Sequence, residues 1–367
     1  MPYFPDDTSP NAFALSGAFR LAKNRTCIKN RRNGGLTTRG GWGKNTHEIG
    51  MNIGQIIEKG GVNREEAETL VSLPEAELFA SATALREHYF GKRVEACFII
   101  NAKSGNCNMN CRFCSQSAFN STPVPKYPFK SSEELTEIIA RWEDKPVERC
   151  GIVTSGGVLT DADVEQLAQF IEQRKSSGKK GPIICGSLGR LKEHALQRLK
   201  HAGLDRIHHN LETSEAFYPN ICTSQQWRDR LDTIHRAKTA GFSVCVGGLF
   251  GLGETWADRL DFAYSLKEEG IHNIPMNFLY PHPGTPMAQQ PVMPAEEALR
   301  IIALFRHILP DATLRICGGR VSVLKERQRD MFAAGANAFM TGDYLTISGA
   351  GVEGDLAMLR ELGLEIE

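Results

Sequence analysis

Three cysteines lie close enough together in the chain to hold one metal cluster. They form the stretch Cys107-Asn-Met-Asn-Cys111-Arg-Phe-Cys114, with three and then two residues between neighbours. Soft thiolates suit iron–sulfur clusters or zinc, and typical zinc sites use paired C-x2-C knuckles. No second pair follows, so the three thiolates favour an iron–sulfur cube with one iron left open for a ligand. Zinc, or a thioredoxin-type C-x-x-C redox motif, is the alternative.

Four further cysteines fall on four separate segments that we expect to be strands. They are Cys150, Cys185, Cys245 and Cys317. Barrel strands alternate their side chains between the lumen and the helix layer, so the right register would bring all four thiols into the lumen. A buried free cysteine is also a common small hydrophobic residue. Cys27, Cys97 and Cys222 show no evident partner, and we assign them no role.

The elements that must position these thiols follow a regular rhythm of short apolar runs and longer amphipathic stretches. We expect strands over 96–101, 149–154, 182–188, 206–211, 243–249, 273–279, 312–317 and 336–340. We expect helices over 132–143, 161–176, 190–202, 225–240, 255–269, 295–308 and 322–334. This α/β pattern predicts a closed (β/α)8 TIM-type barrel, with a doubly wound open sheet as the alternative. A barrel places its site at the carboxyl ends of the strands.

The first 50 residues differ in composition from the rest of the chain. They carry eight Lys and Arg against three Asp and Glu and lack a sustained apolar period. We expect a flexible basic segment over 1–50, with a targeting peptide or an upstream start before Met51 as alternatives. N-terminal helices should follow over 51–90, with a capping box at Asn63 and Glu66. The barrel should span 91–350, and a C-terminal helix 351–367.

The composition excludes several classes of protein. Lys and Arg number 43, as do Asp and Glu, whereas a nucleic-acid-binding chain usually has a basic excess. No run approaches 18 consecutive apolar residues, so we expect no membrane-spanning helix. Ten cysteines in 367 residues are too sparse for a disulfide scaffold. Because exposed clusters oxidise easily, we expect a reducing, cytoplasmic location. From the charge balance and the lack of a long apolar run, we expect no nucleic-acid or membrane partner.

At the three-cysteine motif the chain resembles the radical S-adenosylmethionine (SAM) superfamily, whose signature is C-x3-C-x2-C after the first barrel strand. Over residues 53–365 it resembles the biotin synthase family more specifically. The matching stretches are 99–107, 209–214, 245–255, 274–277, 284–286, 314–320 and 342–346. The resemblance implies that two SAM molecules are consumed while sulfur from an auxiliary cluster is inserted into dethiobiotin to form biotin.

The resemblance also implies two clusters. A [4Fe–4S] cluster on Cys107, Cys111 and Cys114 would bind SAM and cleave it to a 5′-deoxyadenosyl radical. The implied ligands of an auxiliary [2Fe–2S] cluster, or a variant of it, are Cys150, Cys185, Cys245 and Arg315. Cys317 lies two residues beyond Arg315, hence on the same strand face, where many family members carry another residue. It could replace Arg315 as the fourth ligand, change the cluster type, or be a bystander.

Roles toward SAM and the substrate follow from the same resemblance. Residues implied to contact SAM are Asn210 and Glu212 at the ribose, Arg230 at the methionine carboxylate, and Phe113 and Leu249 at the adenine. Residues implied to contact dethiobiotin are Asn210 and Asn277 at the ureido ring and Thr346 at the carboxylate. Glu212 stands where an aspartate is often found, and Ile347 where the family often has a second threonine.

Other functions share part of this pattern. A maturase for hydrogenase cofactors, or an enzyme like methylornithine synthase, would share the barrel and first motif without needing the further strand cysteines and Arg315. An iron–sulfur carrier would leave the residues for SAM and substrate without a purpose. We expect a reducing electron-transfer protein as a partner, and the family resemblance implies a homodimer.

Overall fold

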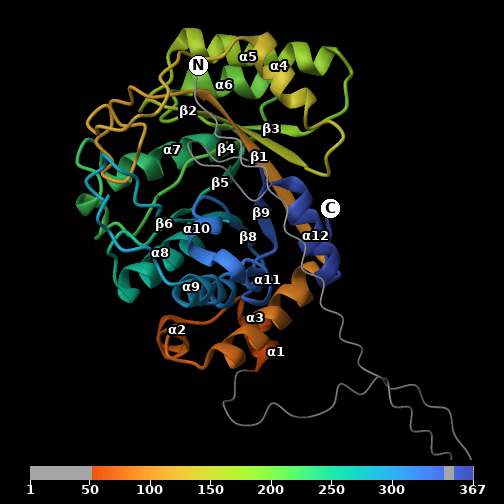
Figure 1. Cartoon of the computed structure of the whole chain (residues 1–367), viewed down its shortest axis with the longest axis vertical. Coiled ribbons are helices and arrows are strands. Elements are labelled where there is room, and N and C mark those ends of the chain that lie inside the picture. Colours follow the sequence, from red (N-terminus) through yellow and green to blue (C-terminus); the bar gives the residue numbers. More distant parts are fainter. Residues whose placement is uncertain (1–51, 343–350, 367) are drawn as a thin grey trace, which may run out of the picture. The chain divides into compact units, whose positions relative to one another are not determined.

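Parallel strands form the centre of the protein in the computed structural model, which describes residues 52–342 and 351–366 (Figure 1). The strands are β1 (Arg93–Lys103), β2 (Arg149–Thr154), β3 (Ile183–Ser187), β4 (Arg206–His208), β5 (Ser243–Cys245), β6 (Gly248–Phe250), β7 (Asn273–Phe278), β8 (Thr313–Ile316) and β9 (Ala338–Met340). Their order in the sheet is β5-β4-β3-β2-β1-β9-β8-β7-β6. The expected eight strands are all present, because β5 and β6 together occupy the strand expected over 243–249.

The ring of strands closes through β5 and β6, which end the path and are separated only by Val246 and Gly247. The N–H of Val246 donates to the carbonyl of Asn273 at the start of β7 (2.9 Å). On the other side, the N–H of Leu249 donates to the carbonyl of Glu212 just after β4 (2.8 Å). The predicted TIM-type barrel is therefore confirmed, and the open doubly wound sheet is excluded.

Helices cover the outside of the strands (Figure 1). They are α4 (Ser132–Ala140), α5 (Asp161–Ser176), α6 (Glu193–Ala202), α7 (Trp227–Thr239), α8 (Trp256–Glu268), α9 (Ala295–Ile308), α10 (Arg320–Leu324) and α11 (Asp330–Ala333). The single helix expected over 322–334 is instead broken into α10, a 3-10 turn over Lys325–Arg327 and α11. Lys325 interrupts it because its φ of 49° lies outside the right-handed helical region.

Short helices precede the barrel and one follows it. They are α1 (Ile53–Lys59), α2 (Arg64–Leu70), α3 (Glu75–Phe90) and α12 (Val352–Leu362). The predicted capping box at Asn63 and Glu66 is present at the start of α2. Helix α3 packs against α9, and β10 (Glu365–Ile366) pairs in parallel with the beginning of β1. The segment expected over 1–50, with its alternatives, lies outside the described residues.

Neighbouring residues of the strands face opposite layers, and two sets of contacts identify the layers. Phe98 of β1 stacks on Trp142 beyond α4, with ring centroids 4.0 Å apart. Phe98, Ile152 and Ile184 belong to one buried core with residues of α4, α5 and α6. Ile99, one residue after Phe98, lines a cavity in the lumen instead. Up to the register shift after Asn101, odd-numbered residues of β1 therefore face the lumen and even-numbered residues face the helices.

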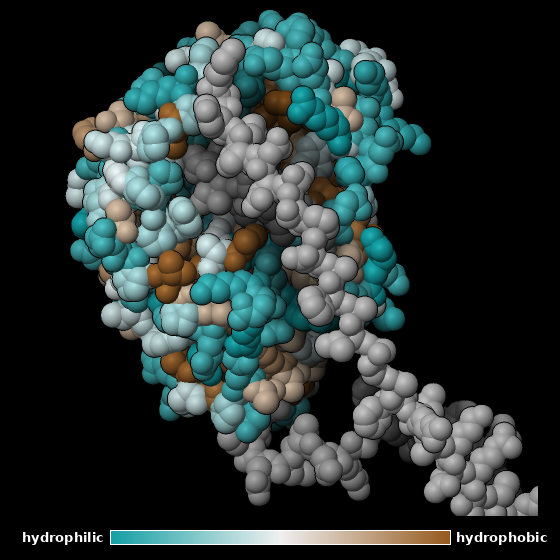
Figure 2. All heavy atoms as spheres, in the orientation of Figure 1, coloured by the Kyte–Doolittle hydropathy of each residue, from teal (hydrophilic) through white to brown (hydrophobic). Residues whose placement is uncertain are grey.

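The outer surface carries mixed residue types. The face visible in Figure 2 is largely hydrophilic, with scattered hydrophobic groups. Within the described ranges, no helix combines the length and the apolar character that crossing a membrane would need.

Candidate active site

The three-cysteine loop follows β1 and is held in a compact conformation. The N–H of Cys107 donates to the carbonyl of Gln116 (3.0 Å), which closes the loop on itself. The side-chain amide of Asn120 donates to the carbonyls of Cys111 (3.1 Å) and Cys114 (2.8 Å). These contacts place three thiols on one constrained loop at the carboxyl end of a barrel strand.

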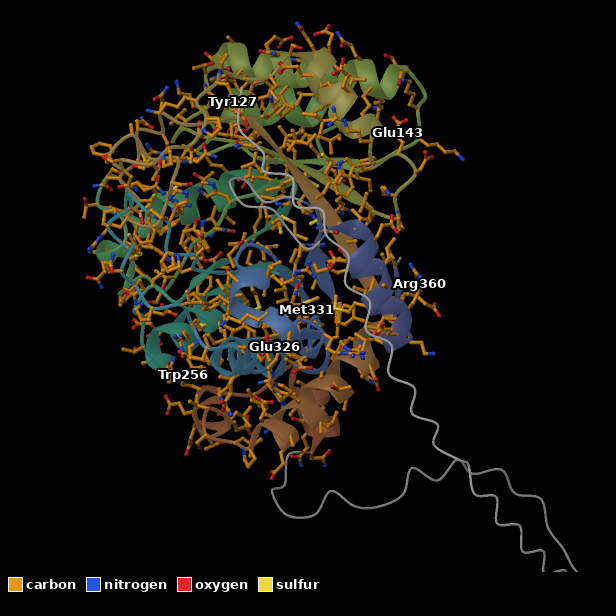
Figure 3. The ribbon with its side chains drawn as sticks, viewed as in Figure 1. Tyr127, Glu143, Trp256, Glu326, Met331 and Arg360 are labelled. Atoms are coloured by element: carbon orange, nitrogen blue, oxygen red, sulfur yellow. The ribbon has the colours of Figure 1, made fainter. Side chains whose placement is uncertain are left out.

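The loop is anchored to the strand that precedes it. The hydroxyl of Tyr127, which is labelled in Figure 3, donates to the carbonyl of Asn101 near the end of β1 (2.9 Å). The backbones of Tyr127 and Ser104 also exchange two hydrogen bonds of 3.1 Å. The long connection between β1 and α4 is therefore tied back to the barrel.

The donor set of this loop fits an iron–sulfur cube. Cys111 is buried, and Cys107 and Cys114 are half-buried. Burial and, to a smaller extent, the nearby Cys107 thiol raise the pKa of Cys114 to about 11. Among the described residues, no three His, Cys, Asp or Glu side chains converge on one point that could hold a single metal ion. A cube does not need such convergence, because each thiolate binds a different iron atom.

Cys222, to which the sequence analysis assigned no role, lies against this loop. Cys222 and Cys111 belong to the same buried core, and the Cys222 thiol raises the pKa of Cys111. It also donates to Oδ1 of Asn110 (3.5 Å), and the N–H groups of Thr223 and Ser224 donate to the same oxygen (3.0 Å each). The chain after β4 therefore brings a fourth thiol into contact with the predicted cluster loop.

A cavity of about 420 Å³ opens at the carboxyl ends of the strands. Six residues that the sequence analysis assigned to the site line it. They are Phe113, Asn210, Glu212, Leu249, Asn277 and Cys317. Arg230 does not line this cavity, and Thr346 lies outside the described residues. Most of the residues predicted for SAM and substrate therefore meet at one place.

Arg230 of α7 lies behind the polar wall of this cavity. Its Nη1 is 3.5 Å from Oε1 of Glu212 and donates to the carbonyl of Asn210 (2.8 Å), while Nε donates to the hydroxyl of Tyr218 (2.8 Å). Burial raises the pKa of Glu212, and Arg230 lowers it in part. Arg230 also lowers the otherwise raised pKa of Cys111. Its positive charge is therefore close to both the cavity carboxylate and the cysteine loop.

Backbone contacts orient the two asparagines of the cavity. Oδ1 of Asn210 accepts from the N–H of Gly247 (3.2 Å). Nδ2 of Asn277 donates to the carbonyl of Gly248 (3.1 Å), and its Oδ1 accepts from the N–H of Gly318 (2.9 Å). These hydrogen bonds fix the orientation of both side-chain amides, so their remaining donors and acceptors point in defined directions.

The structure corrects the expectation for Cys150, whose side chain faces the helix layer and not the lumen. Cys150 lies beside Phe98 in the strand register and belongs to the same helix-side core as Phe98 and Ile152. The lumen position is taken by Gly151, where an added Cβ would lie 3.2 Å from Cγ2 of Ile99. Burial raises the pKa of Cys150, and the charges of neighbouring thiols raise it in addition. Such electrostatic forces act through the sheet and do not require the side chains to be in contact.

The other three predicted strand cysteines face the lumen. Cys185 lies opposite Gly151 in the register, and Nη1 of Arg149 donates to its thiol (3.5 Å). Cys245 lies opposite His208, which lines the cavity, and Cys317 lines the cavity itself.

Cys97 of β1 joins these lumen residues, although the sequence analysis gave it no role. Its side chain packs with Cys317 and Met340, and Ile99 packs against the same group. The sequence could have indicated this position, because Cys97 lies two positions before Ile99 and residues two apart on a strand share one face.

Arg315 of β8 lies in the same lumen and is only 3% exposed. Its Nη2 donates to the carboxylate of Glu95 on β1, and its buried Nη1 has no hydrogen-bond partner among the described residues. Burial alone would lower the pKa of Arg315, but Cys97 and Glu95 raise it above its usual value. The guanidinium is therefore held as a cation next to the lumen thiols.

Two family models match different parts of the chain. A model of the Radical SAM superfamily matches residues 102–265, and a model of the Biotin and Thiamin Synthesis associated domain matches residues 275–365. The barrel and its three-cysteine loop define a radical SAM enzyme, a class that implies a [4Fe–4S] cluster and SAM.

Two curated relatives narrow this class. A biotin synthase of Desulfovibrio desulfuricans is 54% identical over 305 residues, which cover 83% of this chain and 96% of that protein. A biotin synthase of Endomicrobium trichonymphae is 44% identical over 313 residues, which cover 85% of this chain and 97% of that protein. The chain belongs to the biotin synthase family.

Solved structures of lower identity share the fold. Methylornithine synthase aligns with a TM-score of 0.75 at 18% identity, covering 86% of this chain and 97% of that protein. The FeFe-hydrogenase maturase of Carboxydothermus hydrogenoformans aligns with a TM-score of 0.73 at 18% identity, covering 86% and 78%. At this identity the likeness concerns the barrel alone.

Proposed function

We propose that the chain converts dethiobiotin to biotin by radical insertion of sulfur. One observation supports this proposal beyond family membership: a single cavity extends from the three-cysteine loop to the lumen group of thiols. Phe113 of the three-cysteine loop lines the cavity, and so does Cys317 of the lumen group. A substrate bound there would therefore lie between a radical source and a sulfur source.

The carboxyl end of the barrel would bind SAM. Cys107, Cys111 and Cys114 would hold a [4Fe–4S] cluster, which supplies the electron that cleaves SAM into methionine and a 5′-deoxyadenosyl radical. Arg230 would pair with the methionine carboxylate through a charge-assisted hydrogen bond. The ribose hydroxyls would donate to Glu212 and Asn210, and the apolar side chains of Phe113 and Leu249 would pack on the adenine.

The same cavity would orient dethiobiotin. The amides of Asn210 and Asn277 match the N–H and C=O edge of a ureido ring, because each amide carries both a donor and an acceptor. We assign the substrate carboxylate to Thr346. The apolar part of the wall excludes water, which protects a carbon radical from side reactions.

The lumen thiols would hold the sulfur source. Cys185, Cys245 and Cys317, with Arg315 beside them, surround the space in which an auxiliary iron–sulfur cluster would lie. The cluster supplies the sulfur that enters the product. The residues of this chain keep it in the barrel interior, next to the bound substrate.

Further partners follow from this chemistry. Cleavage of SAM needs a one-electron donor, so we include a reducing electron-transfer protein and a reducing, cytoplasmic location in the proposal. A homodimer is included on the family resemblance.

Anaerobic reconstitution of the full chain tests the proposal. We expect two iron–sulfur clusters per chain, and biotin formation when SAM, dethiobiotin and a strong reductant are added. A Cys107→Ala variant, as the control, should retain the auxiliary cluster but produce neither 5′-deoxyadenosine nor biotin. A single cluster in the unmodified chain would refute the proposal, and so would 5′-deoxyadenosine that accumulates without biotin.

A further inference from the structure

The barrel lumen contains one thiol, that of Cys97 on β1, to which the family pattern assigns no role. The neighbouring strand β2 is where the pattern expects a ligand, Cys150. Cys97 of β1 is 6% exposed and packs with Cys317 of β8 and Met340 of β9. Its strand neighbour Phe98 faces the helices, and Ile99 faces the cavity. The alternation of β1 therefore fixes Cys97 in the lumen.

Strand β2 lacks the thiol that the family pattern would place there. Cys150 is fully buried in the core beneath α4 and α5, on the far side of the sheet from the cavity. The adjacent lumen position, opposite Cys185, is Gly151, which has no side chain. A rotation of β2 that brought Cys150 inward would expose Ile152 to the lumen and break the register with both neighbouring strands.

Packing and strand register place Cys97 on the same lumen face as the other thiols. Cys97 packs with Cys317, and Ile99, two positions later on the same face of β1, pairs with Gly151, which in turn lies opposite Cys185. Cys245 lies opposite His208, which lines the same cavity as Ile99 and Cys317. Cys97 therefore shares the barrel lumen with thiols from β3, β5 and β8.

Arg315 is engaged elsewhere in the lumen. Its guanidinium forms an ion pair with Glu95, which lies two residues before Cys97 on the same face of β1. A protonated guanidinium has donors only and no lone pair to offer to iron. Four thiolates, in contrast, are a complete ligand set for an iron–sulfur cluster.

We propose that the auxiliary cluster of this chain is held by four thiolates, Cys97, Cys185, Cys245 and Cys317, with Cys97 replacing the ligand expected at Cys150. Arg315, tied to Glu95, is a neighbouring cation that balances the negative charge of the cluster. This inference rests on the proposed function, because it assumes that the lumen holds a second cluster.

Iron and sulfide analysis of the full reconstituted chain, together with Mössbauer spectroscopy, tests the ligand set. A Cys97→Ala chain should lose most of the auxiliary iron and retain the spectrum of the [4Fe–4S] cluster. The matched control is Cys150→Ala, which removes an equally buried thiol one step away on the neighbouring strand. It should retain the iron of both clusters. Circular dichroism and thermal unfolding of the cluster-free variants establish that each chain folds.

Two results would overturn this inference while leaving the proposed function intact. One is retention of the auxiliary cluster by Cys97→Ala, and the other is its loss from the folded Cys150→Ala chain. If the unmodified chain holds only one cluster, the proposed function fails and this inference fails with it.

A second measurement addresses Arg315 directly. The reduced auxiliary cluster, prepared in protein labelled with ¹⁵N-arginine, should show no strong ¹⁵N hyperfine coupling in electron–nuclear double resonance. A strong coupling would identify Arg315 as an iron ligand and overturn the four-thiolate set.

Discussion

The guanidinium of Arg230 lies 3.5 Å from the carboxylate of Glu212, and only 12% and 13% of the two side chains are exposed. Since Arg230 also donates to the carbonyl of Asn210, this contact ties α7 to the chain that follows β4. The pair therefore joins Glu212, which is predicted to bind the ribose of SAM, to Arg230, which is predicted to bind its methionine carboxylate.

Arg230→Met should raise the KM for SAM about tenfold or more, because a hydrogen bond to a charged group contributes roughly 1.5–3 kcal/mol. Formation of 5′-deoxyadenosine at varied SAM concentrations measures this. The matched control is Arg228→Met on the same helix, where the side chain is 75% exposed and pairs with Glu215. Equal effects of the two substitutions would contradict the assignment of Arg230.

Asn277→Ala should raise the KM for dethiobiotin by about tenfold, because it removes an amide that hydrogen-bonds the ureido ring. The KM for SAM should stay unchanged and serves as the internal control. Biotin formation at varied substrate concentrations measures the effect. A fall in kcat with both KM values unchanged would argue against substrate contact.

Glu95→Gln should lower the free energy of unfolding of the cluster-free chain by about 2–4 kcal/mol, because it leaves the buried Arg315 cation unpaired. Denaturant titration measures this. The control is Glu361→Gln, which removes an exposed ion pair with Arg329 and should cost less than about 0.5 kcal/mol. A loss no larger than that of the control would show that the Glu95–Arg315 pair contributes little.

Cys222 should form a disulfide with Cys111 when the cluster-free chain is exposed to air, because the two residues share one buried core and the Cys222 thiol donates to Asn110, the neighbour of Cys111. Dioxygen would accept the two electrons, and the two thiols would release two protons. Mass spectrometry of linked peptides detects the bond. Oxidised chain should take up less iron on reconstitution until a thiol reductant is added, whereas Cys222→Ser should be protected. Cys111 linked instead to Cys107 or Cys114 would contradict the prediction.

His307 should make the stability of the cluster-free chain sensitive to acid. It is fully buried, its Nδ1 donates to the carbonyl of Ala303 (2.7 Å), and its Nε2 accepts from Ser81 (2.9 Å). Burial lowers its pKa from 6.5 to about 4. The unfolded chain therefore binds a proton in a range where the folded chain does not.

The His307 contribution to stability should be fully present above pH 6.5 and be lost as the pH falls from 6.5 to about 4. The total loss should be about 3 kcal/mol. Unfolding titrations across this range, repeated on His307→Gln, isolate the effect, since the variant should lose less stability on acidification. His272→Gln, at a side chain 64% exposed, is the control and should follow the unmodified chain. Parallel pH profiles of His307→Gln and the unmodified chain would refute the prediction.

The features that the sequence predicted correctly depend on local spacing. Cys107, Cys111 and Cys114 lie within one loop, so their order alone placed three thiols together. The capping box of Asn63 and Glu66 is likewise complete within one helical turn. The barrel followed from the repeated alternation of apolar runs and amphipathic stretches, because each strand and each helix has its own local period.

Two relationships were decided only by the tertiary structure. Strand β2 is buried on both faces, as parallel barrel strands are, so its sequence has no polar alternation to show which way Cys150 points. Only the pairing of β2 with β1 and β3 placed Gly151 in the lumen and Cys150 beneath the helices. Cys222 comes close to the cysteine loop because the chain after β4 folds back over the loop after β1. The sequence thus determined which thiols exist and which are local neighbours, while strand register and loop packing determined which of them meet.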